Sequence, residues 1–147
     1  MSTWLDAAVP YLSALNAAEA TYGIPHNLLA RIAWQESHFR SDIISGAMKS
    51  PAGAVGIMQL LPQYFPGAGN SVLADIATAA RFIANLYQRF NDWQLAVAAY
   101  DWGGGNVHQE ISSDGKPTLD RMPLETQNYV REVFADVPIA GALVEVA

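Results

Sequence analysis

The chain has 147 residues, of which 51% are hydrophobic and 15% are charged, a composition typical of globular proteins and not of disordered ones. Its formal net charge is −6, so no overall positive field attracts a phosphate backbone, and we expect no nucleic-acid partner. Cysteine is absent, which excludes disulfide bonds as a support of the fold. The apolar stretches are shorter than the roughly 20 residues that a spanning helix needs, so we expect no membrane insertion.

The length is close to that of one ordinary domain, and we expect residues 1–147 to form a single domain and to act as a monomer. No internal repeat and no linker interrupt the chain. The first residues, MSTWLD, lack a basic segment followed by an apolar one, so the sequence predicts no secretory signal.

The N-terminal third of the chain predicts two helices. Apolar residues at helical spacing indicate a first helix that has Pro10 in its first turn and ends at Gly23. A second helix is predicted from Pro25 to about Ser37, because proline is favoured in the first helical turn and apolar residues follow three to four positions apart. Glu36 falls in the last turn of this second helix.

The remainder of the chain alternates loops and helices. Residues 40–54 are rich in Ser and Gly and predict a surface loop, which a short segment at residues 56–61 follows. A long helix is then predicted from one apolar stripe, which consists of Leu73, Ile76, Ala80, Ile83 and Tyr87.

Two further helices are predicted at residues 93–100, where three glycines stop the helix, and at residues 124–134. One short hairpin is possible at residues 112–118, and the tail from Val137 either packs or frays. The predicted class is mainly α.

Glu36 is the first candidate for chemistry, in the segment WQESHF at the end of an apolar helix. A carboxyl group there can be half-buried at the floor of a cleft, where burial raises its pKa. A glycosidase needs such an acid, because the carboxyl must be protonated near neutral pH to protonate a leaving glycosidic oxygen. The alternative is a solvated carboxylate at a helix end, which is the commoner situation for Glu.

Three further motifs follow Glu36-Ser37: SPAGAVGIMQLLP at residues 50–62, AAYDWGGG at residues 98–105 and LETQNYV at residues 124–130. In this order and spacing, the blocks resemble the soluble lytic transglycosylase family of the lysozyme superfamily. Its pattern is a Glu-Ser pair, a Gly-(Leu/Ile)-Met-Gln block, an Ala-Tyr-Asn-Ala-Gly block and a Glu-Thr-x-x-Tyr-Val block. The resemblance covers roughly residues 11–134. It implies a mainly α, lysozyme-like domain with a substrate cleft, whose partner is the glycan strand of peptidoglycan.

The resemblance also implies catalytic roles for two residues. Glu36 would protonate the glycosidic oxygen between N-acetylmuramic acid and N-acetylglucosamine, and its carboxylate would then accept the proton of the muramoyl C6 hydroxyl. That hydroxyl attacks C1, so the product carries a 1,6-anhydro ring. Tyr100 would donate a hydrogen bond to the catalytic carboxyl, although a buried Tyr with a satisfied hydroxyl remains the alternative.

Other matched residues are candidates for substrate binding. Ser37 would orient the surroundings of the acid, or it would simply bond a nearby helix carbonyl. Met58 and Gln59 match family residues that line sugar subsites, with core filling as the alternative for Met58. Glu125 and Tyr129 match the last block, where Glu faces or supports the cleft, or is only favoured by the helix dipole. Gly56 would allow a close backbone approach.

The chain departs from the family pattern at two places. The segment between Glu36 and Gly56 is a few residues longer than usual, so the loop at residues 45–49 would reshape one cleft wall. Asp101 and Trp102 stand where the family has Asn and Ala. A hydrolytic glycosidase would use Asp101 as a base or stabiliser, whereas a helix N-cap is the alternative. Trp102 would stack on a sugar or pack in the core.

Three functions therefore remain open: a lytic transglycosylase, which we favour, a hydrolytic muramidase that uses Glu36 and Asp101, and a non-catalytic cell-wall binding module. The three histidines lack metal-ligand spacing, so we expect neither a metal nor another cofactor. Because no secretory signal is predicted, we expect delivery to the cell wall by other components, as for a phage endolysin or a part of a virion or secretion machine.

Overall fold

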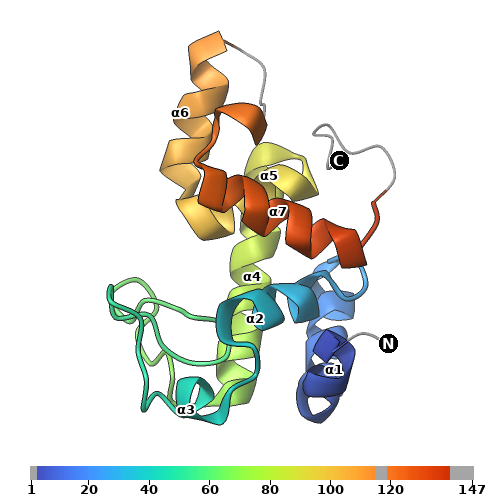
Figure 1. Ribbon diagram of the computed structural model, residues 1–147, viewed down its shortest axis with the longest axis vertical. Coiled ribbons are helices and arrows are strands. Elements are labelled where there is room, and N and C mark those ends of the chain that lie inside the picture. The colour runs from blue at the N-terminus through green and yellow to red at the C-terminus, as the bar shows by residue number, and fades with distance from the viewer. Residues whose placement is uncertain (1–2, 115–118, 140–147) are drawn as a thin grey trace. The chain divides into compact units, whose positions relative to one another are not determined.

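The computed structural model describes residues 3–114 and 119–139, and these residues are mainly helical (Figure 1). Within the described ranges, extended pairing is limited to an isolated antiparallel bridge between Val55 and Leu60. The predicted mainly α class is confirmed. The chain divides into two compact units, Met1–Arg81 and Phe82–Ala147, and the long helix α4 contributes residues to both. A single domain stays a prediction.

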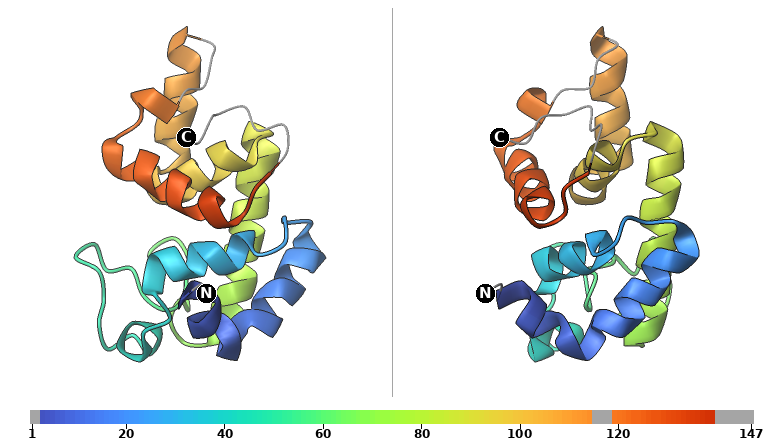
Figure 2. Two further views of the ribbon diagram at one scale, coloured as in Figure 1. Left: turned by 45° about the vertical axis from the view of Figure 1, so that its right-hand side comes forward. Right: turned by 90° about the vertical axis from the view of Figure 1, so that its right-hand side faces the viewer.

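Helix α1 spans Thr3–Tyr22 and packs against α2 in the first unit. The prediction that Pro10 lies in the first turn is wrong, because the helix begins seven residues earlier and contains Pro10 in its interior. Trp4 and Ala8 are buried, so packing of this first segment compensates for the hydrogen bond that the proline cannot donate. Figure 2 shows that α1 changes direction along its length, as expected for a helix that contains an internal proline.

Helix α2 spans Leu28–Ser37, so its predicted start at Pro25 is three residues too early. Asn27 precedes the helix with a left-handed φ of 70° and makes no side-chain cap. The capping acceptor comes instead from Glu19 of α1, whose buried carboxylate accepts hydrogen bonds from the backbone N–H of Asn27 (2.9 Å) and of Ala30 (3.1 Å). The helix therefore begins where α1 supplies partners for its first N–H groups.

The loop predicted at residues 40–54 contains a short helix, α3 (Ser41–Ile44), and is otherwise irregular. The predicted long helix is confirmed as α4 (Val72–Phe90). Ile76, Ala80 and Ile83 of its predicted stripe are buried, but Leu73 is 68% exposed and does not belong to the core. Leu73 lies in the first turn of α4, outside the packed part of the stripe.

The second unit contains α5 (Trp93–Trp102), α6 (Gly104–Asp114), the short 3-10 helix η1 (Leu119–Arg121) and α7 (Leu124–Asp136). Helix α5 packs against both α6 and α7, as Figure 1 shows. The two predicted helices are confirmed and are each two residues longer than expected. Val137 is buried, so the described start of the tail packs.

Helix α6 was not predicted, because its first residues are glycines that favour neither a helix nor a strand. The three-glycine segment interrupts the helical structure at one residue only, Gly103, whose φ is 102°. Residues 112–114 of the possible hairpin are helical, and residues 115–118 lie outside the described part.

No helix in the described residues has the length and apolarity that would let it cross a bilayer.

Candidate active site

Glu36 lies in the last turn of α2 and is partly buried, as the sequence predicts. The helix ends directly after it, because His38 and Phe39 both adopt left-handed backbone conformations, with φ values of 51° and 54°. His38 closes the helix by donating its backbone N–H to the carbonyl of Trp34 (2.9 Å). Two consecutive non-glycine residues with positive φ are unfavourable, so the surrounding packing must hold this reversal in place.

Aromatic rings pack around this reversal. The ring of Phe39 stacks on Tyr11 of α1, with centroids 5.6 Å apart, and lies 6.2 Å from the ring of Trp34. Trp34 also makes an edge contact with His38 at 4.4 Å. These contacts anchor the residues that follow Glu36, so they fix the end of the helix that carries the candidate acid.

Ser37 is fully buried, and its hydroxyl bonds only the local backbone among the contacts described. It donates to the carbonyl of Ala33 (3.0 Å) and accepts the N–H of Phe39 (3.2 Å). This geometry matches the alternative in which Ser37 bonds a nearby helix carbonyl. Ser37 thus secures the backbone on both sides of Glu36 instead of presenting its hydroxyl to solvent.

The Gly-Ile-Met-Gln block forms a tight turn between the two residues of the bridge, Val55 and Leu60. Their backbones exchange hydrogen bonds of 3.0 and 3.1 Å. Within the turn, the carbonyl of Gly56 accepts both the backbone N–H (3.1 Å) and the side-chain amide (3.0 Å) of Gln59. Gln59 has a φ of 52° and is partly exposed, whereas Met58 is fully buried. Gln59 can therefore meet a ligand, while Met58 fills the core beneath it.

The prediction that Gly56 permits a close approach is confirmed. Its φ is 81°, and a Cβ atom at this position would lie 2.5 Å from a carboxylate oxygen of Asp75. The positive φ and this contact both disfavour a larger residue, because the Asp75 carboxylate would have to move to make room for its side chain.

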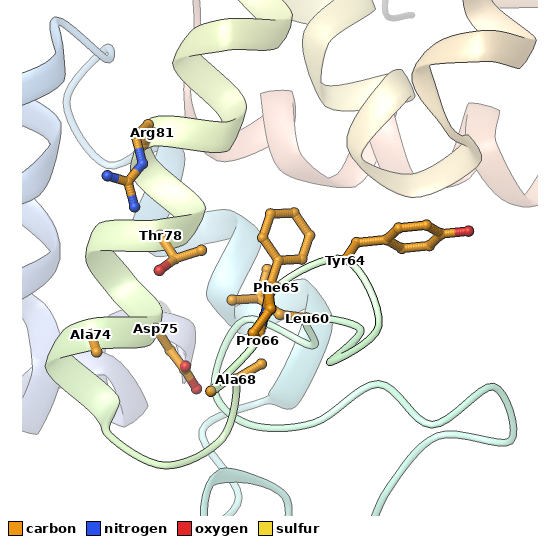
Figure 3. A pocket seen from close by; sticks show the side chains of 10 residues that line it. Leu60, Tyr64, Phe65, Pro66, Ala68, Ala74, Asp75, Thr78 and Arg81 are labelled. Atoms are coloured by element: carbon orange, nitrogen blue, oxygen red, sulfur yellow. The ribbon is translucent and has the colours of Figure 1, made fainter.

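A separate cavity of about 320 Å³ lies in the first unit, between α4 and the loop that precedes it. Thr78 and Arg81 of α4 and Phe65 of the loop are among its lining residues (Figure 3). None of the residues predicted for the site lines this cavity.

In the second unit, α5 carries Tyr100, Asp101 and Trp102 at its C-terminal end. Asp92 precedes this helix, and its carboxylate accepts the N–H of Leu95 (2.9 Å) as an N-cap. Tyr100 is partly buried, and its ring packs against Phe82 with centroids 5.4 Å apart. The α5 cap and the Phe82 contact together fix the position of the phenol.

Asp101 joins α5 to α7. Its carboxylate accepts a hydrogen bond from the hydroxyl of Thr126 (2.9 Å), which is itself buried. Burial raises the pKa of Asp101 above 3.8, the Thr126 hydrogen bond lowers it, and the nearby charge of Glu125 raises it further. The N-cap alternative for Asp101 is wrong, because this residue lies inside α5 and its side chain bonds Thr126.

The other three predicted residues of this unit differ in exposure. Glu125 is exposed in the first turn of α7, whereas Tyr129 is buried in the same helix. Trp102 is partly buried at the end of α5, and its carbonyl accepts the side-chain amide of Asn106 (2.7 Å). Glu125 and Trp102 can thus reach solvent, and Tyr129 supports the helix from inside.

The predicted residues fall into two groups. Glu36, Ser37, Met58 and Gln59 belong to the first unit, and Tyr100 to Tyr129 belong to the second. A hydrogen bond from Tyr100 to Glu36 stays a prediction. Among the described residues, no three His, Asp or Glu side chains gather in a way that would hold a metal ion.

Sequence reasoning missed three polar residues that hold these groups: Glu19, Asp75 and Thr126. Glu19 and Asp75 are charged residues on the buried faces of α1 and α4, and this position in an apolar stripe was the available signal. Thr126 belongs to the Glu-Thr-x-x-Tyr-Val block itself, so the motif contained it without indicating its partner.

Comparison with known proteins identifies relatives of the chain. The family model described as Transglycosylase SLT domain matches residues 13–122. A peptidoglycan transglycosylase of Escherichia phage T7 is 30% identical over 143 residues, which cover 86% of this chain and 10% of the phage protein. The membrane-bound lytic murein transglycosylase D of Escherichia coli (strain K12) is 32% identical over 103 residues, which cover 58% of this chain and 23% of that enzyme.

Two solved structures are also similar. The 70 kDa soluble lytic transglycosylase of Escherichia coli has a TM-score of 0.65 and 27% identity, and the inactive mutant of the lytic transglycosylase Slt from Pseudomonas aeruginosa has a TM-score of 0.70 and 23% identity. Each match covers 85% of this chain and 23% of the other chain. The chain thus spans less than a quarter of the length of the relatives it matches.

Proposed function

Because the chain belongs to the Transglycosylase SLT domain family, we propose that it cleaves peptidoglycan glycan strands as a lytic transglycosylase, with Glu36 as its catalytic acid and base. The observation that carries this proposal is the placement of Glu36: a partly buried carboxyl in the last turn of α2, inside the region that the family matches. The negative end of a helix dipole and partial burial both favour the neutral carboxyl that an acid catalyst needs.

The reaction needs one carboxyl group that acts twice. Glu36 donates its proton to the glycosidic oxygen as the bond from that oxygen to C1 of N-acetylmuramic acid breaks. The resulting carboxylate accepts the proton of the C6 hydroxyl, whose oxygen forms the new bond to C1. The product carries a 1,6-anhydro ring, the proton balance closes, and no water is consumed.

The surrounding residues support this chemistry in different ways. Gln59, Glu125 and Trp102 have exposed or partly exposed side chains, so we assign them to glycan contact. Ser37, Met58 and Tyr129 are buried, and we assign them to holding the site from below. The catalytic role of Tyr100 rests on its match to the family pattern.

The experiment that tests this function is digestion of purified cell walls by the parent chain and by Glu36→Gln, with mass spectrometry of the muropeptides. We expect 1,6-anhydro products from the parent. The Gln variant should lose cleavage by at least about a thousandfold with an unchanged melting temperature, because an amide keeps the shape but cannot donate the proton. Substantial cleavage by the variant would exclude Glu36 as the acid. If the parent chain binds cell walls without cutting them, it is a binding module and not an enzyme.

Hydrolysis of the same bond is the competing function, and it would use Asp101 as a base. The carboxylate of Asp101 already accepts the Thr126 hydroxyl (2.9 Å), so one of its oxygens is engaged in joining α5 to α7 and not in activating water. Hydrolysis would add one water to each product, so the same mass spectra distinguish the two reactions.

We also propose that the chain acts as a monomer that inserts into no membrane and binds no nucleic acid, and that a phage particle or a secretion machine delivers it to the wall. The phage relative supports the delivery route. Size-exclusion chromatography with light scattering tests the monomer, and detection of the chain in purified virions tests the delivery.

A further inference from the structure

Asp75 is a buried carboxylate that joins α4 to the loop in front of it. It is 3% exposed and lies in the first turn of α4. Both of its carboxylate oxygens accept the backbone N–H of Gly69, at 3.1 and 3.0 Å. Figure 3 shows Asp75 pointing from α4 towards the loop segment that contains Ala68. The side chain therefore fixes the end of this loop to the helix.

The same carboxylate also limits the position of the turn that carries Gln59. Gly56 lies so close to it that a Cβ atom there would be 2.5 Å from Oδ2. Gly69 packs on the neighbouring residue in turn, because its own Cβ would be 2.8 Å from Cγ2 of Val55. The Asp75 carboxylate, the backbones of Gly69 and Gly56, and the side chain of Val55 thus form a clamp, which we define as these four residues.

Gln59 depends on this clamp through Gly56. The carbonyl of Gly56 accepts both the backbone N–H and the side-chain amide of Gln59, so a shift of Gly56 would move both groups. We propose that Asp75 is a positioning residue that holds the turn from Gly56 to Gln59 and thereby sets the orientation of Gln59 towards the glycan. The clamp itself does not depend on the proposed function. Only the identification of the ligand as a glycan rests on that function.

A purely structural role would not require a carboxylate at this position. Burial raises the pKa of Asp75, against the opposing effect of the Gly69 hydrogen bond, so ionisation of this carboxyl costs more in the fold than in water. A carboxylate nevertheless offers two acceptors and no donor. An asparagine keeps one acceptor but directs an NH₂ group at the glycine backbones, and an alanine removes both acceptors. The two substitutions therefore form a graded series.

The test compares Asp75→Asn and Asp75→Ala with the parent in three measurements: thermal unfolding, amide hydrogen exchange at Gln59, and kinetics on soluble peptidoglycan fragments. We expect Asp75→Ala to speed exchange at the Gln59 N–H by about tenfold, the effect of losing roughly one hydrogen bond. KM should rise by about the same factor while kcat stays within about twofold. Asp75→Asn should lie between the alanine variant and the parent.

Glu19→Gln is the matched control, because Glu19 is also a buried carboxylate of the first unit that accepts backbone N–H groups, but it does not contact the clamp. We expect this control to lower the melting temperature and to leave exchange at Gln59 and KM unchanged. If Asp75→Ala behaves like the control, Asp75 is structural only and the proposal is wrong. If Asp75→Ala does not fold, Asp75→Asn decides between the same two outcomes.

Gly56→Ala provides an independent check of the contact. Alone, it should speed exchange at Gln59, because the new methyl group would meet the Asp75 carboxylate. Asp75→Ala should partly reverse that effect in the double variant, since it removes the opposing oxygen atoms. Additive effects of the two substitutions would contradict the clamp. If the parent proves unable to cleave peptidoglycan, the proposed function fails, whereas the exchange measurements still decide the role of Asp75.

Discussion

Replacement of Asp101 by Asn tests the reaction type and the link between α5 and α7 together. A transglycosylase uses the C6 hydroxyl of its substrate as the nucleophile, so it needs no second carboxylate. A hydrolase needs one to activate water, and its removal would be nearly as damaging as removal of the acid. We therefore expect Asp101→Asn to keep most of the cleavage activity and to yield 1,6-anhydro products.

The expected effect on stability follows from the contacts of Asp101. The Asn carbonyl can still accept the Thr126 hydroxyl, so a hydrogen bond that contributes about 1 kcal/mol is retained. Burial and Glu125 raise the pKa of Asp101, which means that its contribution to stability is full below pH 3.8 and is lost as the pH rises through the raised value. The Asn variant should therefore be at least as stable as the parent at neutral pH and fall behind it in acid.

Thermal unfolding between pH 3 and pH 8 measures how the difference in stability between the Asn variant and the parent changes with pH. Thr126→Val is a matched variant that removes the hydrogen-bond donor instead of the carboxylate. Without the donor, the partly buried carboxyl loses its partner, and we expect a loss of about 1–3 kcal/mol at neutral pH. This corresponds to roughly 3 °C in Tm per kcal/mol for a chain of this size. An inactive Asp101→Asn variant together with reducing-end products from the parent would refute the reasoning in favour of hydrolysis. A stability difference that does not depend on pH would refute the pKa argument.

Two further predictions concern the candidate site and its support. Tyr100→Phe should lower kcat by about tenfold or more while KM stays nearly constant, if the phenol donates a hydrogen bond to the acid, and steady-state kinetics on peptidoglycan fragments would measure this. An unchanged kcat would assign Tyr100 to its packing with Phe82 alone. Glu19→Ala should destabilise the fold by about 2–5 kcal/mol, because the N–H groups of Asn27 and Ala30 lose their acceptor in a buried place. Chemical denaturation measures this loss, and a change below about 1 kcal/mol would show that water replaces the carboxylate.

Regular packing explains which parts of the fold the sequence predicted. Helices α4, α5 and α7 bury apolar residues at helical spacing, so local periodicity was sufficient. The predicted start of α1 was wrong. The local preference of proline for a first turn placed Pro10 there, but the burial of Trp4 and Ala8 stabilises a helix that begins earlier. Helix α6 was missed because its glycines carry no local preference for a helix, and its contact with α5 stabilises it instead.

The candidate site likewise contains features that the sequence could predict and features that it could not. The position of Glu36 followed from the end of an apolar helix and from an ordered set of motifs, both of which are local in sequence. The partners that hold the motifs are distant: Glu19 bonds Ala30 across 11 positions, and Asp101 bonds Thr126 across 25. Only the tertiary fold selects such pairs, so a sequence can mark the residues as polar but cannot pair them.

The bond between Asp101 and Thr126 also explains how the chain tolerates its departure from the family pattern. The family has Asn where this chain has Asp101, and its last block includes the Thr that Thr126 matches. Asn and Asp both offer a side-chain oxygen to a hydroxyl donor, and they differ in charge. The property that the two residues share at this position is therefore the acceptor for Thr126, which joins α5 to α7. A mechanism with one catalytic carboxyl requires only that shared acceptor, and it leaves the charge of Asp101 without a chemical task.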